Sequence, residues 1–277
     1  MTEPHILVLL DTTPASEAAL DSAARLARHR QLELIALFVE DQDLIALASH
    51  AFSREISALS GQSHPFDHET LLTRLAIQRR QIETCLNALD QQERLRWRLD
   101  VVTGPVVESI RQAALGAEWV VLGKSGWSTS RGKRLGSTAM GLIGDSPTTV
   151  MLWEGRPLPG SSTVVALITD ADSAAAILAV ADTLATATAT GRALLLVFPP
   201  GVNPAVEQSA LDARSGASTA TMAEQLGASP LSALARILRA HPGAELVIGR
   251  AAAGALGCRL EDLLMLSEGP VVIVPTE

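Results

Sequence analysis

Nearly continuous apolar segments recur along this chain, and they constrain its fold more than any other feature. The first of them, HILVLL at residues 5–10, shows no alternation of polar and apolar residues. A strand that is apolar on both faces belongs in a parallel sheet whose two faces are covered by helices. Residues 17–30 place alanine and leucine on one helical stripe, and a second apolar segment follows at 32–39. The sequence therefore predicts β-α-β units with right-handed crossovers.

The pattern of strand and helix continues to residue 153 and then starts again. In the first half we expect strands at 97–102, 118–122 and 148–153, helices at 41–52, 68–89, 106–115 and 137–143, and loops at 60–67 and 123–136. In the second half we expect strands at 163–169, 193–198, 245–248 and 270–275, and helices at 173–190, 229–240 and 256–266. Asp11 and Asp170 follow the first strand of each half, which marks the halves as an internal repeat.

This repeat predicts two tandem α/β domains. We assign residues 1–154 and 163–277 to them, with the Pro-, Gly- and Ser-rich segment 155–162 as the linker. Each domain is expected to hold an open, mostly parallel five-stranded sheet flanked by helices, with its own buried core. The second domain is eroded, because residues 199–228 stand where the first has 40–105. A long helix is therefore expected to be lost or shortened, and the sequence does not place the third strand.

The amino-acid composition indicates which classes of partner are not expected. The chain carries 22 basic and 30 acidic residues, a formal net charge of −8. A net-acidic surface repels anions, so neither a nucleic acid nor a membrane surface is an expected partner. Cys85 and Cys258 lie in apolar, helix-like stretches and are interpreted as buried, unreactive thiols. Without a disulfide framework, a signal-like N-terminus or an apolar run of about 18 residues, a cytoplasmic location is expected.

The stretch from Trp119 to Thr138, WVVLGKSGWSTSRGKRLGST, has the order strand, glycine-bearing loop and helix N-terminus. Its glycines let the backbone turn sharply and approach a ligand closely. Free N–H groups and the positive end of the helix dipole favour a phosphate at the start of a helix. The candidate phosphate-binding residues are Gly123, Lys124, Gly126, Arg131, Gly136, Ser137 and Thr138.

Two further candidates stand at the ends of predicted strands. In an open parallel sheet, ligands sit outside the carboxyl ends of the strands, where the strand order reverses. Asp11 follows the first strand, and its carboxylate could accept hydrogen bonds from ribose hydroxyls or from an adenine amine. It could equally cap the helix that follows, and the two roles can coexist. Val39 ends the second strand and could offer its backbone to adenine.

The spacing Gly123-x-x-Gly126, nine residues and then Gly136-Ser137 resembles the nucleotide loop of the ATP-binding universal stress proteins. The opening ILVLLDTTPASEAALDSAARLA is similar to that family's first strand, aspartate and helix. The resemblance implies a Rossmann-like fold that binds ATP, ADP or AMP, with Mg²⁺ as the ordinary companion of ATP. It places Asp11 and Val39 at the adenosine, and Gly123, Gly126, Gly136, Ser137 and Thr138 at the phosphates.

The resemblance also implies how the two halves assemble. The end strands of this fold commonly pair, so 148–153 and 271–274 would pair within one chain as an intrachain pseudo-dimer. A homodimer is the other assembly left open. The second half departs from the family pattern at residues 249–258, GRAAAGALGC, where no Gly-Ser pair opens the next helix at the required spacing. A single intact nucleotide site, in the first half, is therefore expected.

Three functions remain open at this stage. The first is a stress-response module that binds an adenine nucleotide and acts on an unidentified protein partner. The second is an interaction scaffold without nucleotide, and the third is a slow ATP-hydrolysing enzyme. No residue is assigned a catalytic role, because the chain has neither a Walker loop nor a nucleophile elbow. His64, Asp67 and His68 lack a clear further ligand and are interpreted as solvent-exposed residues rather than as a metal site.

Overall fold

The computed structural model describes residues 3–50, 52–57, 60–93, 95–124, 135–144, 146–155, 163–188, 192–213 and 220–275. The strands of the first half are β1 (His5–Leu9), β2 (Glu33–Asp41), β3 (Arg54–Ile56), β4 (Ser63–Pro65), β5 (Trp97–Gly104), β6 (Ala117–Gly123) and β7 (Thr149–Trp153). Its helices are α1 (Pro14–Arg30), α2 (Gln42–Ala48), α3 (His68–Glu93), α4 (Val106–Ala113) and α5 (Ser137–Ile143). Residues 156–162, most of the expected linker, lie outside the described residues.

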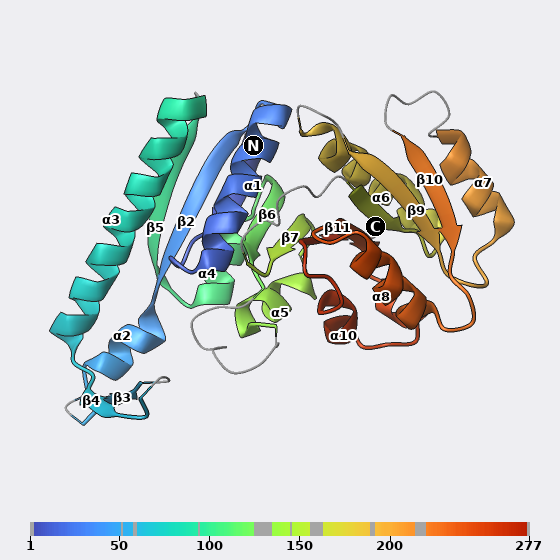
Figure 1. Ribbon diagram of the computed structural model, residues 1–277. Coiled ribbons are helices and arrows are strands. Elements are labelled where there is room, and N and C mark those ends of the chain that lie inside the picture. Colours follow the sequence, from blue (N-terminus) through green and yellow to red (C-terminus); the bar gives the residue numbers. More distant parts are fainter. Residues whose placement is uncertain are drawn as a thin grey trace.

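The second half repeats this order of elements in shorter form (Figure 1). Its strands are β8 (Thr163–Leu167), β9 (Ala193–Phe198), β10 (Thr221–Gln225), β11 (Glu245–Gly249) and β12 (Val271–Val274). Its helices are α6 (Ala171–Thr186), α7 (Pro204–Ala213), α8 (Pro230–Ala240), α9 (Ala252–Ala255) and α10 (Leu260–Leu264).

Each half contributes five parallel strands to one continuous sheet. The strand order is β10-β9-β8-β11-β12-β7-β6-β1-β2-β5, so the order reverses between β1 and β6 and again between β8 and β11. The expected open, mostly parallel α/β sheets are therefore present. In such a sheet, a reversal of strand order opens a crevice at the carboxyl ends of the strands. The two reversals of strand order, one in each half, are equivalent in topology.

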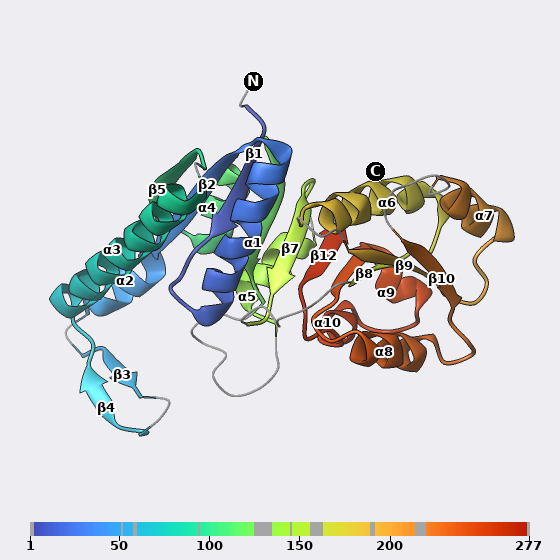
Figure 2. The same cartoon turned by 45° about the horizontal axis from the view of Figure 1, so that its top comes forward.

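The two halves join where β7 runs antiparallel to β12, and Figure 2 shows these two strands side by side. Met151 lies opposite Val272, with Leu152 and Val150 opposite Val271 and Ile273. All these side chains are buried. The pairing involves the two end strands that the sequence analysis expected to meet within one chain. We call this junction, β7 and β12 together with the residues that directly precede and follow them, the seam.

The hydrophobic core is divided by the faces of the sheet and not by the halves of the chain. One cluster contains residues of α1, α3, α6 and α7, and the other contains residues of α4, α5, α8 and α10. Each cluster draws strands from both halves; Ile6 and Val164 share the first, and Leu7 and Val165 the second. The expectation of a separate core for each domain is therefore wrong, because the seam makes the sheet continuous and side chains alternate between its two faces.

The expectation that the long helix is lost or shortened in the second half is confirmed: α7 has 10 residues where α3 has 26. The third strand, which the sequence did not place, is β10. Two element predictions need correction. The helix predicted at 256–266 begins only at Leu260, because Gly257 takes a left-handed conformation (φ 65°) between α9 and α10. The loop expected at 60–67 contains β4, which pairs with β3 in a short hairpin.

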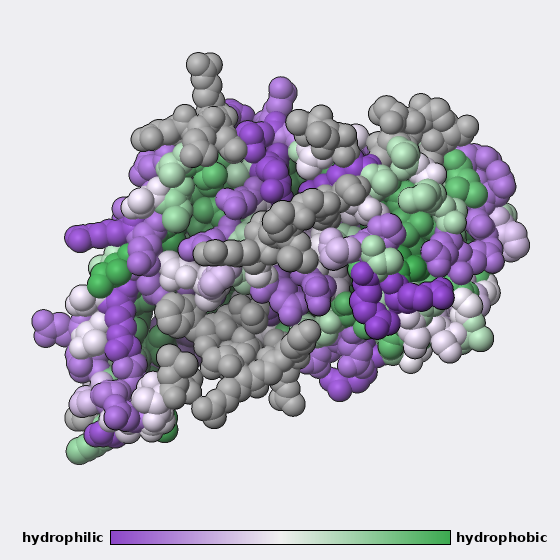
Figure 3. Space-filling model, viewed as in Figure 1, coloured by the Kyte–Doolittle hydropathy of each residue, from purple (hydrophilic) through white to green (hydrophobic). Residues whose placement is uncertain are grey.

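The face of the molecule seen in Figure 1 is mostly hydrophilic. Figure 3 shows hydrophilic residues spread over the face seen in Figure 1, with smaller hydrophobic areas between them. Among the described residues, the helices are either too short or too polar to cross a bilayer.

Gly269, just before β12, is held against backbone of the second half. A Cβ at this position would lie 2.3 Å from the carbonyl oxygen of Ala244. We expect Gly269→Ala to lower the free energy of unfolding by about 1–3 kcal/mol, because backbone atoms cannot rotate away as a flexible side chain can. Urea denaturation measures this change. Gly254→Ala is the control, since Gly254 lies in α9 with open space around it, and it should be neutral or stabilising. Equal stabilities for the two variants would contradict the close approach.

Candidate functional site

The candidate site lies at the carboxyl ends of β1 and β6, where the strand order first reverses. The two strands are parallel, with Val8 opposite Val121, so both end at the same edge of the sheet. Asp11 follows β1 after one intervening residue, and Gly123 is the last residue of β6. The fold thus brings together two predicted site residues that are 112 positions apart in the chain.

Asp11 organises the turn that leads from β1 into α1. Its Oδ1 accepts hydrogen bonds from the Thr13 backbone N–H at 3.0 Å and from the Thr13 hydroxyl at 2.6 Å. Thr13 is the N-cap of α1, and its hydroxyl oxygen accepts from the Ser16 N–H at 3.3 Å. The helix cap is therefore Thr13, and Asp11 supports the cap without being it. Asp11 is half-buried and lies just beyond β1, at the reversal of strand order.

Thr12, between these two residues, has a left-handed backbone with φ at 60°. That region disfavours side chains branched at Cβ and costs roughly 1–3 kcal/mol. Such strain persists only where the surrounding structure enforces it. Here Asp11 and Thr13 close the turn on both sides, and the Thr12 hydroxyl accepts a hydrogen bond from Gln78 of α3 at 3.3 Å.

The glycine-bearing loop is closed at its base. The Gly136 N–H donates to the Lys124 carbonyl at 2.8 Å, and α5 begins at the next residue with Gly136 as its N-cap. As a glycine, this N-cap has no side chain that could cap the helix. Ser137 and Thr138, the first two residues of α5, lie beside the loop base, exposed and half-buried respectively. The predicted site residues Gly126 and Arg131 fall in 125–134, outside the described residues.

Val39 lies on β2, the neighbour of β1, opposite Val102 of β5. Its half-buried side chain packs in the cluster that also contains α4 and α5. The prediction that β2 ends at Val39 is short by two residues, since the strand continues to Asp41. Val39 therefore lies one strand further from the reversal than Asp11, on the same edge of the sheet.

Lys124 does not lie where the sequence analysis placed it. Its side chain is only 1% exposed, and its Nζ donates to the carbonyls of Ser267 at 2.7 Å and Gly269 at 3.2 Å. A carboxylate oxygen of Glu154 lies 3.5 Å from the same nitrogen. This corrects the assignment of Lys124 to the phosphates, because its ammonium group is bound inside the seam. Sequence reasoning missed the partners because backbone carbonyls 143 and 145 residues away leave no local signal.

Arg250 makes the reciprocal contact from the second half. It follows β11 as Lys124 follows β6, and its guanidinium donates to the carbonyl of Ser146. Ser146 and Ser267 are themselves equivalent. Each is buried shortly before the last strand of its half, and each hydroxyl accepts a backbone N–H two residues on, at 3.2 Å. The seam is thus an approximately two-fold arrangement of cation and carbonyl within one chain.

The second reversal of strand order, between β8 and β11, differs from the first. Asp170 is itself the N-cap of α6, and it accepts hydrogen bonds from the Ser173 N–H, the Ser173 hydroxyl and the Thr169 hydroxyl. A Cβ on Gly249 would already meet Ser173 at 3.3 Å. Here α6 packs close to the carboxyl end of β11, and the Asp170 carboxylate caps α6.

Burial alone raises the pKa of Asp170, but the hydrogen bonds from Thr169 and Ser173 outweigh it and lower the pKa overall.

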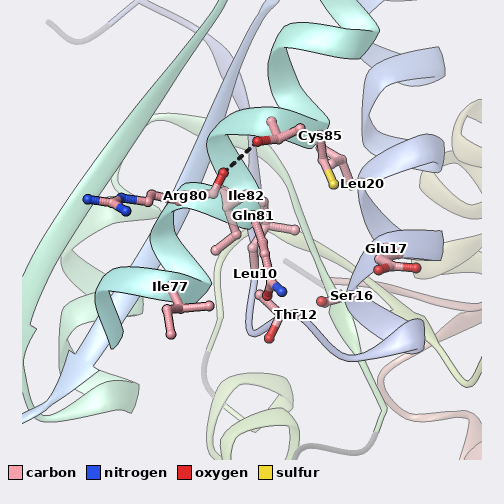
Figure 4. Close-up of a pocket in the computed structure, with 11 residues that line it drawn as sticks. Leu10, Thr12, Ser16, Glu17, Leu20, Ile77, Arg80, Gln81, Ile82 and Cys85 are labelled. Carbon is pink, nitrogen blue, oxygen red and sulfur yellow. Dashed lines mark hydrogen bonds between the residues drawn. The ribbon is translucent and has the colours of Figure 1, made fainter. Parts of the chain in front are cut away.

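A cavity of about 610 Å³ lies between α1 and α3, on the face of the sheet opposite α5 (Figure 4). Gln81 extends toward Thr12 at one end of it, and Cys85 lies beside Leu20 at the other. A second cavity of about 540 Å³, between α3, α2 and the β3–β4 hairpin, shares Thr12 and Gln81 with the first. Sequence reasoning singled out neither cavity, because their walls are ordinary amphipathic helix faces.

The interpretation of Cys85 as a buried thiol is wrong, since this residue is exposed on the cavity side of α3. Partial desolvation, with Glu17 and Asp21 nearby, raises its pKa and so favours the protonated thiol. Cys258 is half-buried, and burial likewise raises its pKa.

The strained turn gives a first test. We expect Thr12→Gly to raise the free energy of unfolding by about 1 kcal/mol, because glycine adopts a positive φ without a steric penalty. The expected gain in the free energy of unfolding is smaller than the strain energy at Thr12. Glycine also adds entropy to the unfolded chain, and the hydrogen bond to Gln78 is lost. Thr13→Ala, which removes the adjacent cap, should lower stability by about 1 kcal/mol. Thermal and urea unfolding check both, and a destabilised Thr12→Gly protein would refute the strain argument.

The pH dependence of stability tests the contribution of the Asp170 charge. Because its pKa is lowered by folding, its charge contributes stability above the unfolded pKa near 3.8, and that contribution disappears as pH falls through the folded pKa. Asp170→Asn keeps a capping oxygen and removes the charge. The variant should be less stable than the parent at pH 7, by less than about 1 kcal/mol because solvent reaches the carboxylate. The gap should close in urea titrations as pH falls through the folded pKa of Asp170, which lies below 3.8. A gap independent of pH would show that the charge is not responsible.

Comparison with known proteins places the fold. The family model described as "Universal stress protein family" matches residues 4–153. No curated protein matches this sequence. A universal stress protein from Archaeoglobus fulgidus DSM 4304 has a similar structure, with a TM-score of 0.68 and 15% identity, over 98% of this chain and 96% of that one. A functionally unknown protein from Pseudomonas aeruginosa PAO1 matches with a TM-score of 0.56 and 16% identity, over 98% of this chain and 92% of that one.

At such identities the two structures establish similarity of fold alone, and they extend it over both halves. The family model covers the half that holds the glycine-bearing loop, and its match spans more than half of the chain. On this evidence the chain belongs to the universal stress protein family.

Proposed function

We propose that this protein binds one adenine nucleotide, ATP or its products ADP and AMP, in the crevice between β1 and β6, and that it serves in a stress response through that binding. The observation that carries the proposal is the closed base of the glycine-bearing loop. The Gly136 N–H is bonded to the Lys124 carbonyl, which sets the start of α5 beside the end of β6.

The start of α5 suits the phosphates. The first N–H groups of a helix have no intrahelical partners, and the N-cap here is Gly136, which has no side chain to cap them. The hydroxyls of Ser137 and Thr138 add donors at the same place. Gly123 and Gly136 leave room for close approach of a ligand to the backbone, and Gly126 and Arg131 would complete the loop. Lys124 has no part in this contact, because its ammonium group lies in the seam.

The adenosine would lie toward β2. Asp11 stands beside the reversal of strand order with its carboxylate held in the turn, where a ribose or adenine donor could reach it. The backbone of Val39, one strand further along the same edge, would contact adenine. With ATP bound, Mg²⁺ would bridge phosphate oxygens and supply compensating charge.

A single site per chain fits the difference between the halves. In the second half, Asp170 is engaged by Thr169 and Ser173, and Gly249 is packed against Ser173. The helix after β11, α9, starts at Ala252, only three residues beyond the strand, so the spacing of the first-half loop is not repeated. We propose binding rather than turnover, because no described residue at the ends of the first-half loop is a base for water activation.

A scaffold role is the second candidate, and exposed apolar residues favour it. Leu47 of α2, Phe52, and Ile56 of β3 are 55%, 94% and 72% exposed. They lie in or beside α2 and the hairpin, at one end of the molecule (Figure 2). Exposed hydrophobic patches of this kind mark protein contacts. This role does not exclude a nucleotide, since the patch and the crevice are formed by different elements.

Isothermal titration with ATP, in the presence and absence of Mg²⁺, tests the nucleotide. We expect one site per chain, and we expect Gly136→Asp to weaken binding at least tenfold, because a carboxylate at the start of α5 repels phosphate. Gly144→Asp is the matched control: it adds the same charge at the other end of α5, where nothing lies within 4 Å of the new Cβ. Absence of heat and of a thermal shift at millimolar ATP would overturn the proposal in favour of the scaffold. Two equivalent sites would overturn the single-site assignment.

A further inference from the structure

The segment between β6 and β7 carries the proposed phosphate contacts, and the second half holds it at both ends. At its start, the Lys124 side chain donates to the carbonyls of Ser267 and Gly269. At its end, the Ser146 carbonyl accepts from Arg250. Both contacts cross the seam, and α5 lies between them in the chain.

The buried ammonium group of Lys124 requires hydrogen-bond acceptors inside the protein. An ammonium group that is 1% exposed is stable only when its hydrogen bonds are made within the protein. Two of its acceptors are backbone carbonyls of the second half, and the third group, Glu154, directly follows β7. These carbonyls are rigidly placed: Ser267 accepts the Gly269 N–H, and the backbone of Gly269 packs against that of Ala244. The second half therefore determines where the Lys124 side chain can lie.

The same residue closes the glycine-bearing loop. The carbonyl of Lys124 accepts the Gly136 N–H at 2.8 Å, so side chain and backbone of one residue join the second half to the loop base. Because Lys124 is next to Gly123, a shift of its side chain would be transmitted to the end of β6 and to the start of α5. Lys124 is thus a positioning residue.

We propose that the second half is an intramolecular regulator of the nucleotide site, holding the described ends of the loop and α5 in their binding geometry through Lys124 and Arg250. The inference rests on the proposed function for the identity of the ligand, but the mechanical link between seam and loop does not depend on it. A binding segment that is already held in place loses less entropy when a ligand binds. The two contacts of Lys124 and Arg250, which we call the clamp, would therefore raise affinity by preorganising the start of α5. Coupling of this kind is reciprocal, and nucleotide should in turn stabilise the seam.

Two variants test the clamp from its two sides. Lys124→Met keeps the aliphatic stem and removes the ammonium group, and Arg250→Met does the same in the second half. The matched control is Arg259→Met, which removes a cation of the second half whose side chain is 76% exposed and paired with Glu261. Each full-length protein is first checked by circular dichroism and thermal unfolding. Two measurements follow: hydrogen–deuterium exchange of residues 135–144 without nucleotide, and titration with ATP.

We expect faster exchange in residues 135–144 for Lys124→Met and Arg250→Met, and ATP affinity lower by at least about fivefold, the lower end of ordinary coupling between sites. The Arg259→Met protein should match the parent in both. Unchanged exchange and affinity in both seam variants would overturn the inference. If Lys124 instead contacted phosphate directly, its variant would lose affinity with no change in exchange, which also overturns it.

The nucleotide assignment and the clamp can be refuted independently of each other. A parent protein that binds no ATP refutes the nucleotide assignment, and the exchange data then decide the clamp alone. Unchanged exchange in both seam variants would refute it. If Lys124→Met does not fold, Arg250→Met carries the same two readouts.

Discussion

The antiparallel pairing of β7 with β12 is the constraint on which the rest of this structure depends. It joins ten strands into one sheet and makes the two core clusters continuous from one half to the other. It also brings the segments that precede each end strand into reach of the opposite half. A cation from each side then donates to carbonyls of the other, the buried Lys124 from the first half and the half-buried Arg250 from the second. Strand pairing supplies the geometry, and the buried charges make it specific, because an unpaired buried charge is costly.

A repeated fold with unequal halves fits the proposal of a single nucleotide site in the first half. Both halves reverse strand order at the same place and both retain an aspartate after their first strand. Asp11 supports a cap made by Thr13, whereas Asp170 is the cap itself. In the second half, α7 is short and no Gly-Ser pair follows β11 at the first-half spacing. The second half keeps the strand β12 that the seam requires, and the proposed role in support of the first half would account for that retention.

Much of the fold could be predicted from local patterns. The apolar segments identified the buried strands because strands covered on both faces cannot tolerate polar residues. Secondary-structure predictions failed where the local sequence pattern fits more than one element. Gly257 delays the start of an expected helix. The residues of β10 are mixed in polarity and partly exposed, so they do not resemble a buried strand. The exposed position of Cys85 was missed for a similar reason, since an amphipathic helix such as α3 does not reveal which neighbours cover its faces.

By itself the sequence determined the order of elements, the repeat, the family and the spacing of the glycine-bearing loop, because each of these is written in residues that are near one another. Only the tertiary structure decided the direction of the Lys124 side chain, the division of the core by sheet faces and the left-handed turn at Thr12. The physical reason is distance along the chain. A buried ammonium group takes whichever acceptors the fold brings to it, and backbone carbonyls more than a hundred residues away have no signature in a local pattern.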